Sequence, residues 1–211
     1  MIEYIIPANP DDRVIKRAIS FIQEGEVIAF PTDTSWVLAA SPFHKNGLEN
    51  IRRIKSMEEG KHLSLICESL SQISQYAEVT TFAFRIMKRF LPGPYTFILH
   101  PNKNLPRYIK SYHKAGEIGV RIPQSVLCSR LVHFMEGPLL TTSISCELLG
   151  MEIGDIYSYQ IEDSLGGQLK MIIDPGELEL LGPSTVVSLT IEGELSILRE
   201  GAGSTEQLKS S

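Results

Sequence analysis

The sequence predicts an α/β fold, a twisted sheet that mixes parallel and antiparallel strands with helices flanking it. Amphipathic helical stretches alternate with short apolar strands in the first half of the chain, and strands dominate after residue 170. No internal repeat or linker interrupts the 211 residues, of which 43% are hydrophobic, and this length is enough for one substantial core. We therefore expect a single domain over residues 1–201 and a polar C-terminal tail over residues 202–211.

A helix, a strand and a polar loop are expected to open the chain. Apolar residues follow the i, i+3, i+4 spacing over residues 12–22, and Gly25 is placed to end this helix. Residues 27–30 are apolar and read as a strand that breaks at Pro31. The loop that follows offers two threonine hydroxyls, a carboxylate and an indole, which together can bind a small polar substrate. The alternative is a Pro-Thr-Asp turn in which Asp33 caps the next helix.

The remaining elements follow from periodicity and from the positions of glycine and proline. Further helices are expected at residues 47–56, 70–76, 80–90 and 123–136. Strands are expected at residues 63–67, 95–99, 118–122, 139–145, 171–173, 185–189 and 195–198. Residues 102–114 are expected to form a basic surface loop, residues 147–167 show only a weak pattern, and the residues after 201 are expected to fray.

The charges are distributed unevenly along the chain. Between Lys45 and Arg130 there are 14 Lys and Arg residues against 6 Asp and Glu, a balance of +8 within a chain of net charge −5. A basic middle in an acidic chain indicates a site for an anion, such as a nucleotide or an RNA backbone. Solvated helix faces are the plainer explanation for part of these charges.

The composition also excludes several classes of protein. No stretch approaches the roughly 18 uncharged apolar residues of a membrane span, and the N-terminus lacks the basic start and apolar run of a signal peptide. The three cysteines, Cys67, Cys128 and Cys146, share no metal-ligand spacing. Each lies among apolar residues, so we expect buried reduced thiols, no protein metal site, no membrane association and a cytoplasmic location.

Seven separated pieces of sequence fall at predicted strand ends or turns. They are residues 31–34 (Pro-Thr-Asp-Thr), 55–61, 92–96 (Pro-Gly-Pro-Tyr-Thr), 120–123 (Val-Arg-Ile-Pro), 142–143 (Thr-Ser), 184–187 (Ser-Thr-Val-Val) and 198–201 (Leu-Arg-Glu-Gly). In this order they resemble the YrdC/YciO family, and the pattern is most similar to its YciO-type branch. One such piece is weak evidence, whereas seven in one order are strong.

The resemblance implies a YrdC-like domain with a large concave basic cavity. The best-known members of the family join L-threonine, bicarbonate and ATP into threonylcarbamoyl-AMP and release pyrophosphate. Their product supplies the threonylcarbamoyl group of threonylcarbamoyladenosine in tRNA. The resemblance therefore implies ATP as a substrate, Mg²⁺ accompanying the ATP, and double-stranded RNA or tRNA as a further partner. The chemistry agrees with the residue types, because a triphosphate that loses pyrophosphate needs cations more than acid–base groups.

The resemblance also assigns roles to individual residues. The catalytic residues it implies are Lys55, Arg121 and Ser143. The substrate-binding residues it implies are Thr32, Thr34, Trp36, Thr96 and Ser184. The nucleotide-binding residues it implies are Lys55, Arg52, Lys61, Ser143, Ser145 and Arg199. Structural alternatives stay open, since Arg121 could form a buried ion pair, Ser184 could merely start a strand and Arg199 could be an edge-strand charge.

The chain departs from the synthases at several motif positions. Their Lys-x-Arg becomes residues 55–57, with Met57 in place of the arginine, and their Ser-x-Asn becomes residues 143–145. Residues 36–37 (Trp-Val) replace Tyr-Gly, and residues 61–63 (Lys-His-Leu) replace Lys-Pro-Leu. Two functions are consistent with this pattern. One is threonylcarbamoyl-adenylate synthesis, and the other is a YciO-type nucleotide- or double-stranded-RNA-binding paralogue with weak or no synthase activity.

Overall fold

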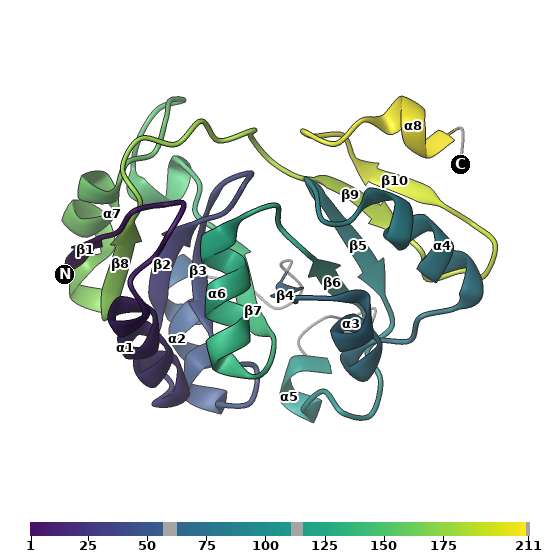
Figure 1. Cartoon of the computed structure of the whole chain (residues 1–211), viewed down its shortest axis with the longest axis horizontal. Coiled ribbons are helices and arrows are strands. Elements are labelled where there is room, and N and C mark those ends of the chain that lie inside the picture. Colours follow the sequence, from purple (N-terminus) through teal and green to yellow (C-terminus); the bar gives the residue numbers. More distant parts are fainter. Residues whose placement is uncertain (57–62, 111–115, 210–211) are drawn as a thin grey trace.

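Ten strands form one sheet in the part of the chain that the computed structural model describes, residues 1–56, 63–110 and 116–209. The strands are β1 Ile2–Tyr4, β2 Ile28–Pro31, β3 Trp36–Ala40, β4 Ser64–Ile66, β5 Tyr95–Leu99, β6 Ile118–Arg121, β7 Leu139–Ser143, β8 Met171–Asp174, β9 Thr185–Ser188 and β10 Ser196–Arg199. Their order across the sheet is β1-β8-β2-β3-β7-β4-β6-β5-β9-β10 (Figure 1). The pairs β1–β8, β2–β8, β4–β6 and β5–β9 are parallel and the other neighbours are antiparallel, which confirms the expected mixed sheet.

Side-chain caps fix where several helices begin. The α-helices are α1 Asp12–Gln23, α2 Lys45–Lys55, α3 Leu70–Tyr76, α4 Thr81–Phe90, α5 Arg107–Lys110, α6 Val126–Met135, α7 Ser158–Leu165 and α8 Thr205–Lys209, with 3₁₀ turns at Glu147–Leu149 and Gly166–Gln168. The side chains that accept a backbone N–H at a helix start are Asp11, Ser69, Thr80 and Ser125, at α1, α3, α4 and α6 respectively. These bonds satisfy N–H groups that have no partner within the helix.

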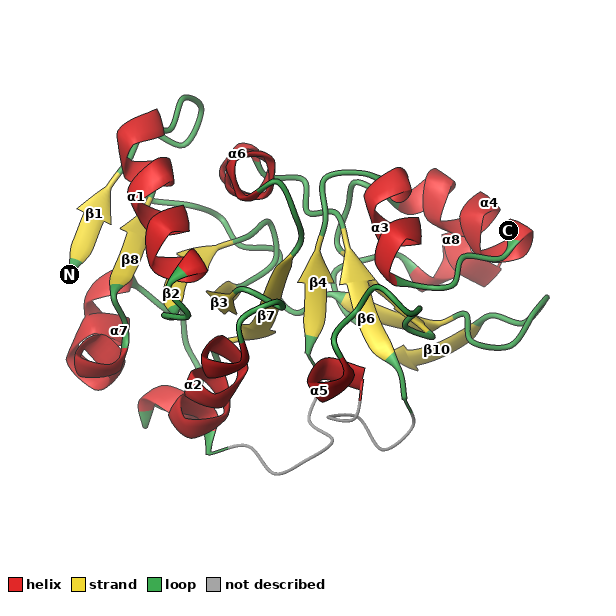
Figure 2. Cartoon of the chain, turned by 90° about the horizontal axis from the view of Figure 1, so that it is seen from below, coloured by secondary structure: helices red, strands yellow, loops and turns green. Residues whose placement is uncertain are grey.

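Helices cover both faces of the sheet. Ile28 and Phe30 of β2 pack with α1 and α6, whereas Ala29 between them packs on the opposite face with residues of α2 and α7. This alternation is the period of two that a strand imposes on its side chains. Figure 2 shows α1 and α6 on one side of the β1–β7 part of the sheet, with α2 and α7 on the other.

Several expectations from the sequence are wrong in detail. A strand, β3, follows the polar turn directly, and the edge strand β1 and helix α7 were not expected. Helix α5 lies within the stretch expected to be a loop, because the buried Ile109 anchors one helical turn there. Helix α2 begins two residues earlier than expected. Cys67 and Cys128 are buried, and burial raises the pKa of each thiol to about 12, but Cys146 is only half-buried.

The residues after 201 pack against the starts of β5 and β9. Thr185 Oγ1 donates to the carbonyl of Gly203 at 2.7 Å, and the hydroxyl of Tyr95 donates to the carbonyl of Ser204 at 3.2 Å. Leu208 of α8 is buried in the main core. The expectation that this tail frays is therefore wrong for the described residues, because backbone contacts and one apolar anchor hold it in place.

Replacing Gly203 by alanine is expected to lower the free energy of unfolding by about 1–3 kcal/mol, the usual cost of overpacking. A Cβ at Gly203 would lie 2.4 Å from the ring of Tyr95, and that ring is held between Phe90 and Phe97. Urea denaturation measures the loss. Gly154→Ala is the control, since a Cβ there meets nothing within 4 Å. Equal stability of the two variants would contradict this packing.

No helix among the described residues is long and apolar enough to cross a membrane.

Candidate functional site

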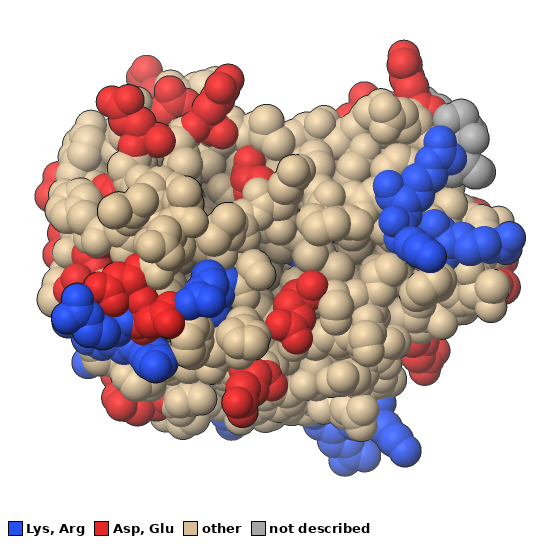
Figure 3. All heavy atoms as spheres, in the orientation of Figure 1, with Lys and Arg blue, Asp and Glu red and all other residues tan. Residues whose placement is uncertain are grey.

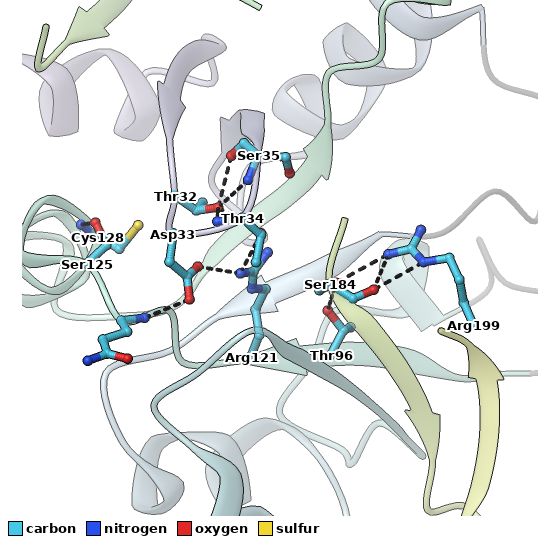
Figure 4. Close-up of polar contacts among 11 residues, drawn as sticks. Thr32, Asp33, Thr34, Ser35, Thr96, Arg121, Ser125, Cys128, Ser184 and Arg199 are labelled. Atoms are coloured by element: carbon cyan, nitrogen blue, oxygen red, sulfur yellow. Dashed lines mark hydrogen bonds and ion pairs between the residues drawn. The ribbon is translucent and has the colours of Figure 1, made fainter. Parts of the chain in front are cut away.

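The turn between β2 and β3 is closed by one threonine. The backbone N–H of Thr32 donates to the carbonyl of Ser35 at 2.9 Å, and the hydroxyl of Thr32 donates to the same carbonyl at 2.9 Å. The N–H groups of Thr34 and Ser35 donate to the hydroxyl of Thr32 at 3.1 and 3.2 Å. In this pattern the threonine hydroxyl takes the place of a backbone hydrogen-bonding group in the turn. It fixes the positions of the two residues that lie between Thr32 and Ser35. Thr32 is therefore a structural residue of the turn (Figure 4).

An arginine from the end of β6 reaches this turn. Nη2 of Arg121 donates to Oδ1 of Asp33 at 2.7 Å and to the hydroxyl of Thr34 at 2.9 Å. Oδ2 of Asp33 accepts the backbone N–H of Gln124 at 3.0 Å. The side chains of Arg121 and Asp33 are each 6% exposed. The alternative that Asp33 caps a following helix is wrong, since a strand follows and the carboxylate binds Arg121 at the end of β6 and Gln124 just after it. The alternative of a buried ion pair for Arg121 is confirmed.

Burial shapes the electrostatics of this ion pair. Burial lowers the pKa of Arg121, the charge of Asp33 opposes that shift, and the charge of Arg199 adds to it. Nε of Arg121 is buried and has no hydrogen-bond partner among the described residues. The neighbouring carboxylate is what makes a buried guanidinium tolerable, because an unpaired buried charge is costly.

A second polar group lies beside Arg121, at the starts of β5 and β9 and the end of β10 (Figure 4). The hydroxyls of Thr96 and Ser184 are 2.8 Å apart. Arg199 donates from Nη2 to the carbonyl of Ser184 at 2.7 Å and from Nε at 3.2 Å. The guanidinium of Arg199 is only partly buried, and that burial lowers its pKa. The positive charge of Arg199 is therefore accessible to a ligand.

A glycine in β6 makes room for this second group. A Cβ at Gly119 would lie 3.0 Å from both Ser64 Cβ and Thr96 Cγ2. Sequence reasoning missed Gly119, although a glycine within an apolar strand is a signal of close approach.

A third group joins α2 to the end of β7. Nζ of Lys55 donates to the carbonyl of Ser143 at 2.7 Å and lies 3.5 Å from the hydroxyl of Thr142. Ser143 pairs with Val37 of β3, so this group is attached to the strand that leaves the Thr-Asp turn. The hydroxyl of Ser145 accepts the N–H of Leu148, which lies in the 3₁₀ turn Glu147–Leu149, at 3.3 Å. The side chain of Ser143 is exposed, so a ligand can reach it.

The other predicted site residues lie elsewhere or outside the described part. Trp36 belongs to β3 and its side chain packs in the main core, not in the loop where the sequence placed it. Arg52 is half-buried on α2, beside Glu49 and Arg53 in a shallow hollow. Lys61 and Met57 lie outside the described residues. The roles of all these residues stay predictions.

The predicted basic cavity also stays a prediction. A hollow of about 540 Å³ lies between α3 and α6 and is lined by Glu68, Gln72, His133 and Glu136 among others, which are not predicted site residues. On the face in Figure 3, Lys and Arg side chains gather in separate groups, one of them over α4, and Asp and Glu lie between them. The basic middle of the chain is thus not one continuous surface on this face.

Comparison with known proteins identifies two kinds of relative, YciO proteins and threonylcarbamoyl-AMP synthases. A family model described as telomere recombination, covering Sua5, YciO and YrdC, matches residues 20–201. The uncharacterized protein YciO of Escherichia coli K12 is 37% identical over 200 residues, which is 95% of each chain. The crystal structure of E. coli YciO superposes with a TM-score of 0.88 over 98% of both chains, at 36% identity.

Threonylcarbamoyl-AMP synthases are more distant. That of Pyrococcus abyssi is 29% identical over 196 residues, which is 92% of this chain and 56% of that one. A structure of P. abyssi Sua5 complexed with L-threonine superposes over the whole of this chain and 60% of that one, with a TM-score of 0.87 and 27% identity.

The fold is thus that of a YrdC-like α/β domain, a mixed sheet with flanking helices. The chain belongs to the Sua5/YrdC/YciO family, and it is similar to YciO over nearly its whole length.

Proposed function

We propose that the protein binds ATP and L-threonine at this site and converts them, with bicarbonate, into threonylcarbamoyl-AMP and pyrophosphate. The observation that carries the proposal is that two cations each lie among polar groups from widely separated segments. Lys55 donates to the carbonyl of Ser143, and Arg199 donates to the carbonyl of Ser184, whose hydroxyl lies 2.8 Å from that of Thr96. The likeness to threonylcarbamoyl-AMP synthases, and to a Sua5 structure complexed with L-threonine, supports it.

The chemistry needs positive charge more than proton transfer. The amine of L-threonine and bicarbonate form a carbamate, with loss of water. A carbamate oxygen then attacks the α-phosphorus of ATP, the bond to the β-phosphate breaks, and pyrophosphate leaves. Lys55 and Arg199 would stabilise the negative charge on the phosphates. Mg²⁺ would enter with the ATP. Hydroxyl groups such as those of Thr96 and Ser184 suit the hydroxyl and carboxylate of L-threonine.

A second candidate function is a YciO-type paralogue that binds nucleotide or RNA without efficient synthesis. The observation in its favour is that relatives matching nearly the full length at 37% identity are YciO proteins, whereas the synthases are 26–29% identical. Ser145, which stands where the synthases have asparagine, accepts the N–H of Leu148 with its hydroxyl. Binding of double-stranded RNA or tRNA, and a cytoplasmic location, stay predictions.

One incubation separates the two functions. The protein is mixed with ATP, L-threonine and bicarbonate, and pyrophosphate and the adenylate are both measured. Synthesis that depends on all three substrates supports the first function. Binding of ATP in calorimetry without any adenylate supports the second.

L-Threonine is expected to raise the melting temperature, in the presence of ATP, more than L-valine does. The two amino acids have the same shape, but L-valine lacks the hydroxyl and would leave a buried hydroxyl partner unpaired, at a cost of about 1–3 kcal/mol. Differential scanning fluorimetry at matched concentrations measures the difference. Equal shifts with the two amino acids would contradict a threonine pocket.

A further inference from the structure

Asp33 joins segments from two parts of the sheet. Its Oδ1 accepts Nη2 of Arg121 at 2.7 Å, and its Oδ2 accepts the backbone N–H of Gln124 at 3.0 Å. Its backbone carbonyl accepts the N–H of Leu181 at 3.1 Å. The turn that carries Asp33 lies between β2 and β3. Arg121 is the last residue of β6 and Gln124 follows that strand, and Leu181 lies in the segment that runs from β8 to β9. Asp33 therefore connects three segments of the chain, namely the β2–β3 turn, the end of β6 and the segment between β8 and β9.

These contacts require the sheet to curve. In the order of the sheet, β7 and β4 lie between β3 and β6, so β3 and β6 are three places apart. Strands three places apart in a flat sheet are separated by roughly 14 Å. Twist and curvature bring the turn and the end of β6 together, and the Asp33–Arg121 pair holds them there.

The two groups that would bind ligand lie on either side of this connection. Lys55 and Ser143 are attached to the β2–β3–β7 part of the sheet, by the pairing of Ser143 with Val37. Thr96, Ser184 and Arg199 belong to the β5–β9–β10 part. The segment held at Leu181 leads directly into Ser184. A change in the curvature between β3 and β6 would therefore change the spacing between the two groups.

We propose that Asp33 is a positioning residue that sets the spacing between the Lys55–Ser143 group and the Thr96–Ser184–Arg199 group for one ligand that contacts both. This inference rests on the proposed function, and it specifies the ligand as two-ended, an amino acid joined to an adenylate. Asp33 suits this role because its side chain is buried, at 6% exposed, as is the neighbouring Thr34, which is 1% exposed. Arg121 then acts through the geometry of the site.

The test compares a two-ended probe with its two separate halves. The probe is a stable analogue of threonylcarbamoyl-AMP in which a sulfamate replaces the phosphate, so that the nitrogen of L-threonine is joined to adenosine through a carbonyl and the sulfamate. The halves are ATP and L-threonine. Calorimetry gives the Kd of each. Asp33→Asn is expected to weaken the probe and ATP about tenfold, because each contacts both groups. It is expected to change the Kd of L-threonine, which contacts only the group of Thr96, Ser184 and Arg199, less than about twofold. A residue that only stabilises the fold would change all three alike.

The controls separate folding, function and spacing. Asp12→Asn removes a surface carboxylate that also pairs with an arginine, Arg130, and is expected to leave all three Kd values unchanged. If Asp33→Asn does not fold, the variant Asp33→Asn with Arg121→Met removes both buried charges and is expected to show the same selective loss. Equal losses for the probe and the halves, or no loss, would overturn the inference alone. An unmodified protein that does not bind the probe more tightly than either half would overturn the proposed function as well.

Discussion

Arg121→Met is expected to lower the free energy of unfolding by about 3–5 kcal/mol, the cost of breaking a buried ion pair from one side. The substitution keeps much of the side-chain volume but leaves the carboxylate of Asp33 without a cation in a site where its side chain is 6% exposed. Among the described residues, the backbone N–H of Gln124 would then be the one hydrogen-bond donor left to the carboxylate of Asp33. Urea denaturation measures the change through the midpoint and the slope.

Two further variants test the cause of this loss. Adding Asp33→Asn to Arg121→Met removes the unpaired charge and is expected to recover part of the stability. Arg130→Met breaks the pair with Asp12, which is largely exposed, and is expected to cost about 1 kcal/mol or less. A loss at Arg121 no larger than that at Arg130 would contradict the assignment of a buried pair.

Lys55→Met is expected to slow pyrophosphate formation about 100-fold, in line with the loss of one preorganised group that stabilises developing charge. The ammonium is held by the carbonyl of Ser143 at 2.7 Å, so its position is fixed before ATP binds. Initial rates at saturating ATP, L-threonine and bicarbonate give the effect on turnover.

Lys45→Met is the matched control for Lys55. Lys45 lies at the other end of the same helix, is exposed, and pairs with Glu49 at 3.3 Å. Its loss is expected to change the rate less than about twofold, because exposed pairs contribute little. Equal rates for the two variants would place Lys55 outside the catalytic site.

Much of the fold could be predicted from sequence because the signals are local. Asp11 and Thr80 are helix caps, and the apolar positions of α1 follow the helical period. Strand β3 was missed because it begins immediately after the polar turn. An apolar run as short as residues 36–40 is also consistent with either a helix or a strand. Helix α8 was missed because one apolar residue, Leu208, anchors an otherwise polar segment.

The site could be predicted only in part. The sequence identified the Thr-Asp-Thr stretch as a polar turn. In the structure its Asp33 and Thr34 side chains make buried contacts with Arg121. The partner of Asp33 could not be predicted, because Arg121 is 88 residues away and only the curvature of the sheet brings the two together. Thr96 and Ser184 are also 88 residues apart, and their hydroxyls meet because β5 and β9 pair side by side, a pairing that local sequence signals do not specify.

The position of β8 between β1 and β2 has a consequence for how the chain is made. Ile2 pairs with Ile172 and Ile28 with Met171, so β1 and β2 both need a partner that is synthesised about 140 residues after β2 (Figure 1). At about 5–20 residues per second, the ribosome needs roughly 7–28 s to pass from the end of β2 to the start of β8. During that interval the apolar side chains of β2 have no β8 to cover one flank, and non-local pairing of this kind folds slowly. We therefore expect the nascent chain to depend on chaperones until β8 emerges.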